Sequence, residues 1–166
     1  RYYFMEMNTR IQVEHPITEM VTGIDLIRQQ IRIAEGLPME ITQDDVVIRG
    51  HAIECRINAE NPARDFMPSG GTIGQLCVPG GNGVRFDSHL YQGYKLPMYY
   101  DSMIGKLIVW ASTRDEAIAK MKSALMELII DGVDTNIYYQ YDLLRSEDFK
   151  TGAYDTGTIE RLQEER

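Results

Sequence analysis

Cysteine is scarce in this chain of 166 residues. Its two cysteines, Cys55 and Cys77, do not form a CxxC pair, so the sequence has no zinc motif of that kind. This pattern fits a reducing cytosol, where a disulfide between them is disfavoured. No apolar run approaches the roughly 18–20 residues that a membrane-spanning helix requires, and no signal-peptide pattern is present. These absences predict a cytoplasmic protein without a membrane partner.

Runs of positive charge are also missing. The formal net charge is −8 and no cluster of Lys and Arg offsets it, which argues against nucleic acid as a partner. Small anions could still bind to a few local arginines. The apolar content of 43% suffices for one compact core, with or without a smaller appended unit. Because the chain starts at Arg1 and runs directly into an apolar segment, we expect it to be cut from a longer protein.

The first 45 residues are predicted to hold one strand and one helix. Residues 2–14 alternate as in a strand, and Pro16 should end it, because proline lacks a backbone donor and keeps His15 extended. Apolar residues at helical spacing predict an amphipathic helix over residues 25–35. A polar connection follows, and we place a domain boundary there, after residue 45.

The second unit, residues 46–166, is predicted to be α+β, with an antiparallel sheet and helices to one side. Alternating apolar residues and glycine-rich turns indicate a meander of strands over residues 51–60, 72–78, 83–87 and 104–111. Thr113 and Glu116 have the spacing of a helix capping box, and Gly132 suits the end of that helix. Two more helices are expected over residues 136–145 and 159–165.

The polar face of the first predicted strand is its most informative feature. Five alternate positions carry two carboxylates, two amides and a guanidinium: Glu6, Asn8, Arg10, Gln12 and Glu14. An ordinary solvated edge strand is the alternative, although Lys, Glu and Thr are the usual residues there. Carboxylate and amide oxygens suit Mg²⁺, and an arginine can bind a carboxylate-like anion with two parallel donors. The pattern therefore indicates a metal site beside an oxyanion site.

Several motifs carry a resemblance that covers nearly the whole chain. EMNTRIQVEHPITEMVTG and GHAIECRINAE are the most specific, and FMPSGG, YYDSMIGKLIVW and ALMELIIDGVDTN extend the likeness. Together they resemble biotin carboxylases of the ATP-grasp superfamily. The resemblance implies the end of an ATP-grasp domain (residues 1–45) followed by a biotin carboxylase C-terminal domain (residues 46–166).

The resemblance also implies roles for individual residues. Glu6 and Asn8 match the Mg²⁺ site, and Glu14 matches the general base that deprotonates bicarbonate. The bicarbonate pocket is matched by Arg10, Gln12, the backbone of Val13, and Glu14. Arg56 matches the residue that binds biotin and stabilises its enolate. A fixed positive charge suits that role, because arginine does not lose its proton, whereas a cross-strand ion pair is the structural alternative for Arg56.

The implied activity is carboxylation of biotin with bicarbonate and MgATP (or MnATP) through carboxyphosphate, the first half-reaction of acetyl-CoA carboxylase in fatty-acid synthesis. The implied partners are the N-terminal part of the same chain, a biotin carboxyl carrier protein and a second copy in a homodimer. We expect the isolated chain to be inactive and to hold none of its cofactors tightly. Propionyl-, methylcrotonyl- and pyruvate-type carboxylases remain alternatives, as do another ATP-grasp ligase and a non-catalytic scaffold.

Other polar residues are expected to be structural. His15 precedes a proline and is interpreted as shaping its loop, and no metal-ligand spacing links it to His51 or His89. The glycine-rich run at residues 80–83 lies between strands and is interpreted as a turn. Asp101 and Lys106 lie in the YYDSMIGK motif and are expected to support the site or the fold.

Overall fold

The computed structural model describes residues 2–164. Its central feature is a three-stranded antiparallel sheet in the order β1–β8–β6, formed by β1 (His51–Asn58), β8 (Met103–Ala111) and β6 (Val84–Ser88). The order corrects the predicted meander, since the last of these strands lies in the middle. β8 is the strand best suited to that place, because most of its residues are buried and a central strand is covered on both faces.

Short strand pairs extend the sheet at one end. They are β2 (Glu60–Asn61) with β3 (Met67–Pro68), β4 (Gly71–Thr72) with β7 (Lys95–Leu96), and β5 (Leu76–Cys77) with β9 (Ile129–Ile130). The single strand predicted over residues 72–78 is therefore wrong. Its backbone changes partner midway: the amide of Ile73 bonds to Tyr94, whereas that of Gly74 bonds to Asp131.

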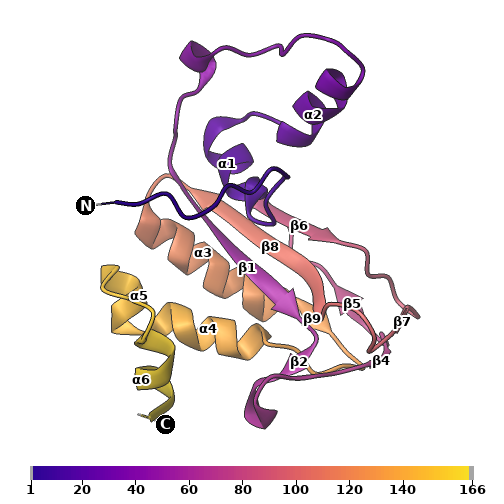
Figure 1. The fold of residues 1–166 in the computed structure, drawn as a ribbon. Coiled ribbons are helices and arrows are strands. Elements are labelled where there is room, and N and C mark those ends of the chain that lie inside the picture. Colours follow the sequence, from indigo (N-terminus) through magenta and orange to yellow (C-terminus); the bar gives the residue numbers. More distant parts are fainter. Residues whose placement is uncertain (1, 165–166) are drawn as a thin grey trace.

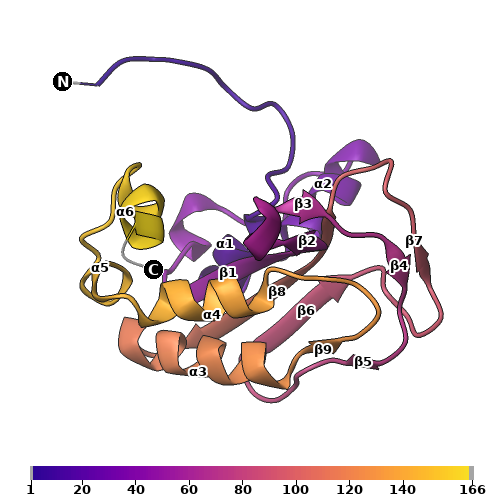
Figure 2. The same cartoon turned by 90° about the horizontal axis from the view of Figure 1, so that it is seen from below.

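Helices cover one face of the central sheet and form the main core with it. α3 (Arg114–Glu127) and α4 (Ile137–Arg145) lie together on that side (Figure 2). Alternation along β1 places Ile53, Cys55 and Ile57 in this core, as predicted. The apolar stripe of α3 packs against them, and its predicted capping box is present. The predicted stop at Gly132 is wrong, because α3 ends at Glu127 and β9 intervenes.

The C-terminal helices follow α4. α6 (Thr158–Glu164) confirms the helix predicted over residues 159–165, whose last residue lies outside the described part of the chain. α5 (Glu147–Thr151) was not anticipated; Ser146 caps it with a side-chain hydrogen bond. None of the helices between residues 2 and 164 is long and apolar enough to cross a membrane.

The other face of the sheet is covered by the N-terminal part of the chain (Figure 1). α1 (His15–Thr22) contacts β1 and β8, and α2 (Leu26–Ala34) lies farther out. The helix predicted over residues 25–35 is confirmed, with Asp25 as its N-cap. Its apolar residues remain open to solvent, since Ile27 is 39% and Ile31 56% exposed.

The strand predicted over residues 2–14 is wrong, as is the extended conformation predicted for His15. Residues 2–9 run outward without a paired strand (Figure 2). A strand requires a neighbour for its backbone groups, and none of the described strands lies beside this segment. A helix begins at His15 instead, with Pro16 in its first turn, where the missing N–H needs no partner.

Candidate active site

Charged side chains form a row across the face of the sheet that α1 covers. The strand register places Arg56 of β1 opposite Lys106 of β8, and Lys106 opposite Asp87 of β6. Side chains alternate along a strand, so these residues point away from the core that the neighbouring positions build. The central sheet therefore presents charged side chains on the face that α1 covers.

The segment from Arg10 to Glu14 lies over this row. Arg56 donates a hydrogen bond from Nη2 to Oε2 of Glu14 at 3.1 Å. Lys106 donates from Nζ to the backbone oxygen of Val13 at 2.9 Å. The tertiary structure thus brings together Glu14, Val13 and Arg56, which the sequence predicted for one site.

The other predicted bicarbonate residues are organised locally. Arg10 donates from Nη1 to Oε1 of Gln12 at 3.0 Å and to the backbone oxygen of Ile11 at 3.2 Å. His15 contacts the backbone oxygen of Gln12 through Nδ1 at 2.7 Å, which fits the predicted loop-shaping role. The segment therefore presents a guanidinium and an amide beside the carboxylate of Glu14.

A cavity of about 350 Å³ opens beside Arg56. Its lining includes Val13, Asn58, Glu60 and Ser102. The two oxygens of Glu60 accept hydrogen bonds from Nδ2 of Asn58, each at 3.3 Å, and Ser102 donates to one of them. Sequence reasoning did not assign these three residues to the site. The signal for Asn58 and Glu60 was present, because both share the polar face of the ECRINAE strand with Arg56.

Glu54 lies on the same face of β1, two residues before Arg56. Burial raises the pKa of this carboxyl, and the positive charges of Lys106 and Arg56 offset the rise only in part. Its Oε2 atom is buried and accepts no hydrogen bond from the described residues. Glu54 is therefore a partly buried acid beneath the Arg56–Glu14 pair.

The two predicted metal ligands stand apart from this cluster. Glu6 and Asn8 lie on the exposed segment 2–9. Within residues 2–164, no three His, Cys, Asp or Glu side chains converge on a common metal position. A carboxylate and an amide oxygen suit Mg²⁺, which commonly binds to one or two carboxylates together with phosphate oxygens and water. The donor types therefore fit a magnesium site that a bound phosphate would help to complete.

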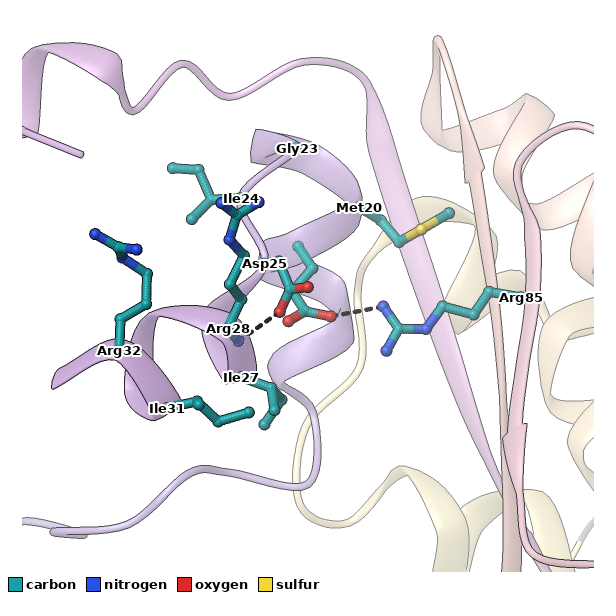
Figure 3. A pocket seen from close by; sticks show the side chains of 10 residues that line it. Met20, Gly23, Ile24, Asp25, Ile27, Arg28, Ile31, Arg32 and Arg85 are labelled. Carbon is teal, nitrogen blue, oxygen red and sulfur yellow. Dashed lines mark hydrogen bonds and ion pairs between the residues drawn. The ribbon is translucent and has the colours of Figure 1, made fainter. Parts of the chain in front are cut away.

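A separate groove of about 670 Å³ lies between α1 and α2, close to β6 (Figure 3). Arg85 reaches its edge and donates from Nη1 to Oε2 of Glu19 at 2.6 Å. Arg85 also bonds twice to Asp87, and these hydrogen bonds raise the pKa of the guanidinium. None of the residues that the sequence predicted as catalytic lines this groove, and the contact between Arg85 and Glu19 at its edge joins β6 to α1.

The geometry defines an α+β domain with an arginine–carboxylate site beneath a polar N-terminal segment, and comparisons with known proteins name its family. The family model described as "Biotin carboxylase C-terminal domain" matches residues 54–161. The model described as "Carbamoyl-phosphate synthase L chain, ATP binding domain" matches residues 1–42. The chain belongs to the biotin carboxylase family, as the motifs predicted.

Relatives and solved structures agree with this assignment. Biotin carboxylase 1 of Bacillus subtilis is 58% identical over 96% of this chain and 36% of its own length. A biotin carboxylase of Pseudomonas aeruginosa is 55% identical over 97% of this chain and 36% of its own length. The biotin carboxylase domain of the Hydrogenobacter thermophilus 2-oxoglutarate carboxylase, solved as a dimer with MgADP, ADP and bicarbonate, has a TM-score of 0.92. It is 48% identical and covers 96% of this chain and 35% of that one. The chain thus spans about a third of the length of the relatives it matches.

Proposed function

We propose that this chain carries the bicarbonate- and biotin-handling part of a biotin carboxylase active site. The contact between Arg56 and Glu14 carries the proposal. It joins the two most specific motifs, EMNTRIQVEHP and ECRINAE. Val13 of the first motif and Arg56 of the second line the same cavity. The domain division after residue 45 belongs to the same proposal, with the first unit contributing Glu14 and the second Arg56.

Bicarbonate is proposed to bind at Arg10, Gln12, Val13 and Glu14. The guanidinium of Arg10 supplies parallel donors for an anion with the shape of a carboxylate. Glu14 takes the proton of the bicarbonate hydroxyl, and the freed oxygen attacks the terminal phosphate of ATP, with ADP leaving. The product of this step is carboxyphosphate, which breaks down to CO2 and phosphate. The 3.1 Å contact with Arg56 supports this assignment, because it places the Glu14 carboxylate beside the residue proposed for the second step.

Arg56 is proposed to serve the second step, transfer of CO2 to biotin. The phosphate released in the first step takes the ureido proton of biotin, which places negative charge on the biotin carbonyl oxygen. A guanidinium fixed on a strand can stabilise that charge without reorganising, and it remains protonated throughout. Its two outer nitrogens allow a shift from Glu14 to biotin between the steps.

Glu6 and Asn8 are proposed as ligands of Mg²⁺. When bound with ATP, the ion neutralises the phosphate charge that would otherwise repel the incoming bicarbonate oxygen. The two side chains provide only part of a coordination shell. We therefore expect them to bind Mg²⁺ weakly unless nucleotide phosphates are present.

The parent enzyme is proposed to be the biotin carboxylase component of an acetyl-CoA carboxylase. Relatives named simply biotin carboxylase support this choice, whereas a pyruvate carboxylase component of Methanothermobacter thermautotrophicus, 56% identical, supports the alternative. A biotin carboxyl carrier protein and a second copy of the enzyme would be the partners, and the solved dimer of a related domain supports the latter. A cytoplasmic location is also proposed, because the free thiols of Cys55 and Cys77 fit a reducing compartment.

The test is ATP cleavage that depends on both biotin and bicarbonate, measured on the natural polypeptide that contains these residues. We expect Arg56→Ala and Glu14→Gln each to lower the rate by about 10²-fold or more. Arg64→Ala is the matched control, because Arg64 is an exposed arginine in the neighbouring turn Pro62–Arg64. A rate of ATP cleavage that does not depend on biotin would identify a different ATP-grasp ligase. The 166-residue chain alone should show no biotin carboxylation, and turnover from it would contradict that expectation.

A further inference from the structure

Two basic residues hold the segment Arg10–Glu14 against the sheet. Arg56 binds the side chain of Glu14, and Lys106 binds the backbone oxygen of Val13. These two residues face each other across β1 and β8 in the strand register. Arg56 must exchange partners in the proposed reaction, but Lys106 need not. Lys106 is therefore the contact able to hold the segment throughout the cycle.

The surroundings of Lys106 make it a rigid anchor. Its side chain is 13% exposed, and its strand neighbour Ile108 on the same face is buried. Asp87 lies 3.8 Å from its ammonium, and Glu54 interacts with it electrostatically. These carboxylates offset the charge of an ammonium that has little contact with water. The hydrogen bond to Val13 at 2.9 Å is shorter than the 3.8 Å ion pair with Asp87, so the closer of these two contacts of the ammonium is with the segment.

α1 does not depend on this bond for its place on the sheet. Glu19 binds Arg85 at 2.6 Å, and the backbone oxygen of Val21 accepts the amide of Arg49 at 2.8 Å. Both contacts lie beyond Pro16, on the helix itself. The bond from Lys106 ends instead on Val13, the residue between the side chains of Gln12 and Glu14.

We propose that Lys106 is a positioning residue. It fixes the backbone at Val13, and so keeps the carboxylate of Glu14 and the bicarbonate donors in a constant position relative to Arg56. The role rests on the proposed function, because it concerns the same site. It assigns to Lys106 a task in bicarbonate activation, without contact with substrate. A displacement of about 1 Å in such a site can lower a rate by about 10²-fold.

Lys106→Met tests the role kinetically in the natural polypeptide. Methionine keeps most of the length and the apolar character of the side chain but cannot donate to Val13. We expect kcat for bicarbonate-dependent ATP cleavage to fall by about tenfold to 10²-fold. The KM for bicarbonate should rise, while the KM for ATP stays unchanged. Lys106→Arg, which restores a charged donor, should recover part of the loss.

Lys120→Met is the matched control. Lys120 also donates to backbone oxygens, those of Asn82 and Trp110, at 3.0 and 2.7 Å. Lys120→Met removes the same kind of bond, but outside the proposed site and far from Glu14 in the chain. The kinetic constants of this variant should match the unaltered enzyme. Unchanged kinetics in Lys106→Met, or an equal loss in Lys120→Met, would overturn the positioning role.

Hydrogen exchange on the 166-residue chain gives a readout that does not depend on catalysis. The amides of His15 and Ile17 bond to the backbone oxygens of Gln12 and Glu14, so their protection reports on the anchored segment. Lys106→Met should accelerate their exchange but leave the amide of Gly23, at the end of α1, unaffected. Equal acceleration at Gly23 would show that Lys106 merely docks the helix, and no acceleration would show that it anchors nothing.

A double variant and the exchange data distinguish a folding defect, or a failure of the proposed function, from a failure of the positioning role. If Lys106→Met does not fold because Glu54 is left without its positive neighbour, Lys106→Met with Glu54→Gln removes both charges and is read in the same way. If the natural polypeptide shows no response to biotin, the proposed function fails, whereas the exchange data still decide whether Lys106 fixes the segment.

Discussion

The guanidinium of Arg56 and the carboxylate of Glu14 lie 3.1 Å apart, although 42 positions separate them in the chain. Each side chain is about half exposed, at 52% and 56%. An exposed pair of this kind contributes little stability, because water screens the attraction and two flexible side chains lose freedom. The pairing therefore matters for chemistry rather than for folding.

Loss of the Arg56–Glu14 pair is expected to have little effect on stability. Arg56→Ala and Glu14→Gln should each change the free energy of unfolding of the isolated chain by less than about 1 kcal/mol. Urea unfolding followed by circular dichroism measures the change, and the double variant gives the coupling energy. A loss of more than about 2 kcal/mol would mark the pair as a structural element.

A second prediction concerns the partly buried acid Glu54. Burial raises its pKa in the folded protein above the unfolded value, so the folded state holds the proton more tightly. Stability is therefore lost as the pH rises from the unfolded pKa through the folded pKa, and the penalty is complete above the latter. Glu54→Gln cannot ionise and should raise Tm at pH 8.

The gain in Tm from Glu54→Gln should shrink as the pH is lowered and vanish below about pH 4, near the unfolded pKa of a glutamate. Thermal unfolding at several pH values checks this dependence. A lower Tm for the variant at pH 8 would mean that the attraction of Glu54 to Lys106 and Arg56 outweighs the cost of its burial.

A third prediction concerns the attachment of α1. The side chain of Glu19 is 9% exposed and binds both Arg85 and the amide of Leu26. Glu19→Ala should lower the free energy of unfolding by about 2 kcal/mol, because the backbone amide of Leu26 loses its partner and Arg85 keeps only Asp87.

The control for Glu19→Ala is Glu147→Ala, which breaks an exposed pair with Lys150. That change should cost no more than about 0.5 kcal/mol. Denaturant unfolding of both variants provides the comparison, and hydrogen exchange shows whether α1 loosens alone. Equal effects of the two substitutions would contradict the anchoring role of Glu19.

A fourth prediction separates the two thiols. Cys55 is 4% exposed in the core, and burial, with a smaller effect from Glu54, raises its pKa to about 12. The reactive thiolate is therefore nearly absent at pH 8. Iodoacetamide should label the half-buried Cys77 alone in the native chain and both cysteines in denaturant. If iodoacetamide labels Cys55 in the native Cys77→Ser variant, the core opens far more readily than its packing implies.

Local patterns in the sequence were sufficient for the elements that pack with their own neighbours. The alternation of Ile53, Cys55 and Ile57 predicted which face of β1 is buried, and the spacing of Thr113 and Glu116 predicted the start of α3. These predictions succeeded because alternation and capping depend on residues within one turn or one strand. The same periodicity failed for residues 2–14, since a strand exists only beside a partner strand.

The chemical types at the candidate site were likewise determined by the sequence itself: an acidic and amide-rich segment with one arginine, a second arginine on a separate strand, and the motifs that place both in the biotin carboxylase family. Only the tertiary structure decided that Glu14 meets Arg56, that Lys106 donates to the backbone oxygen of Val13, and that β8 is the central strand. The physical reason is that strand order and cross-strand register are set by packing between distant segments. No local spacing in the chain encodes which distant side chains that packing brings within hydrogen-bonding distance.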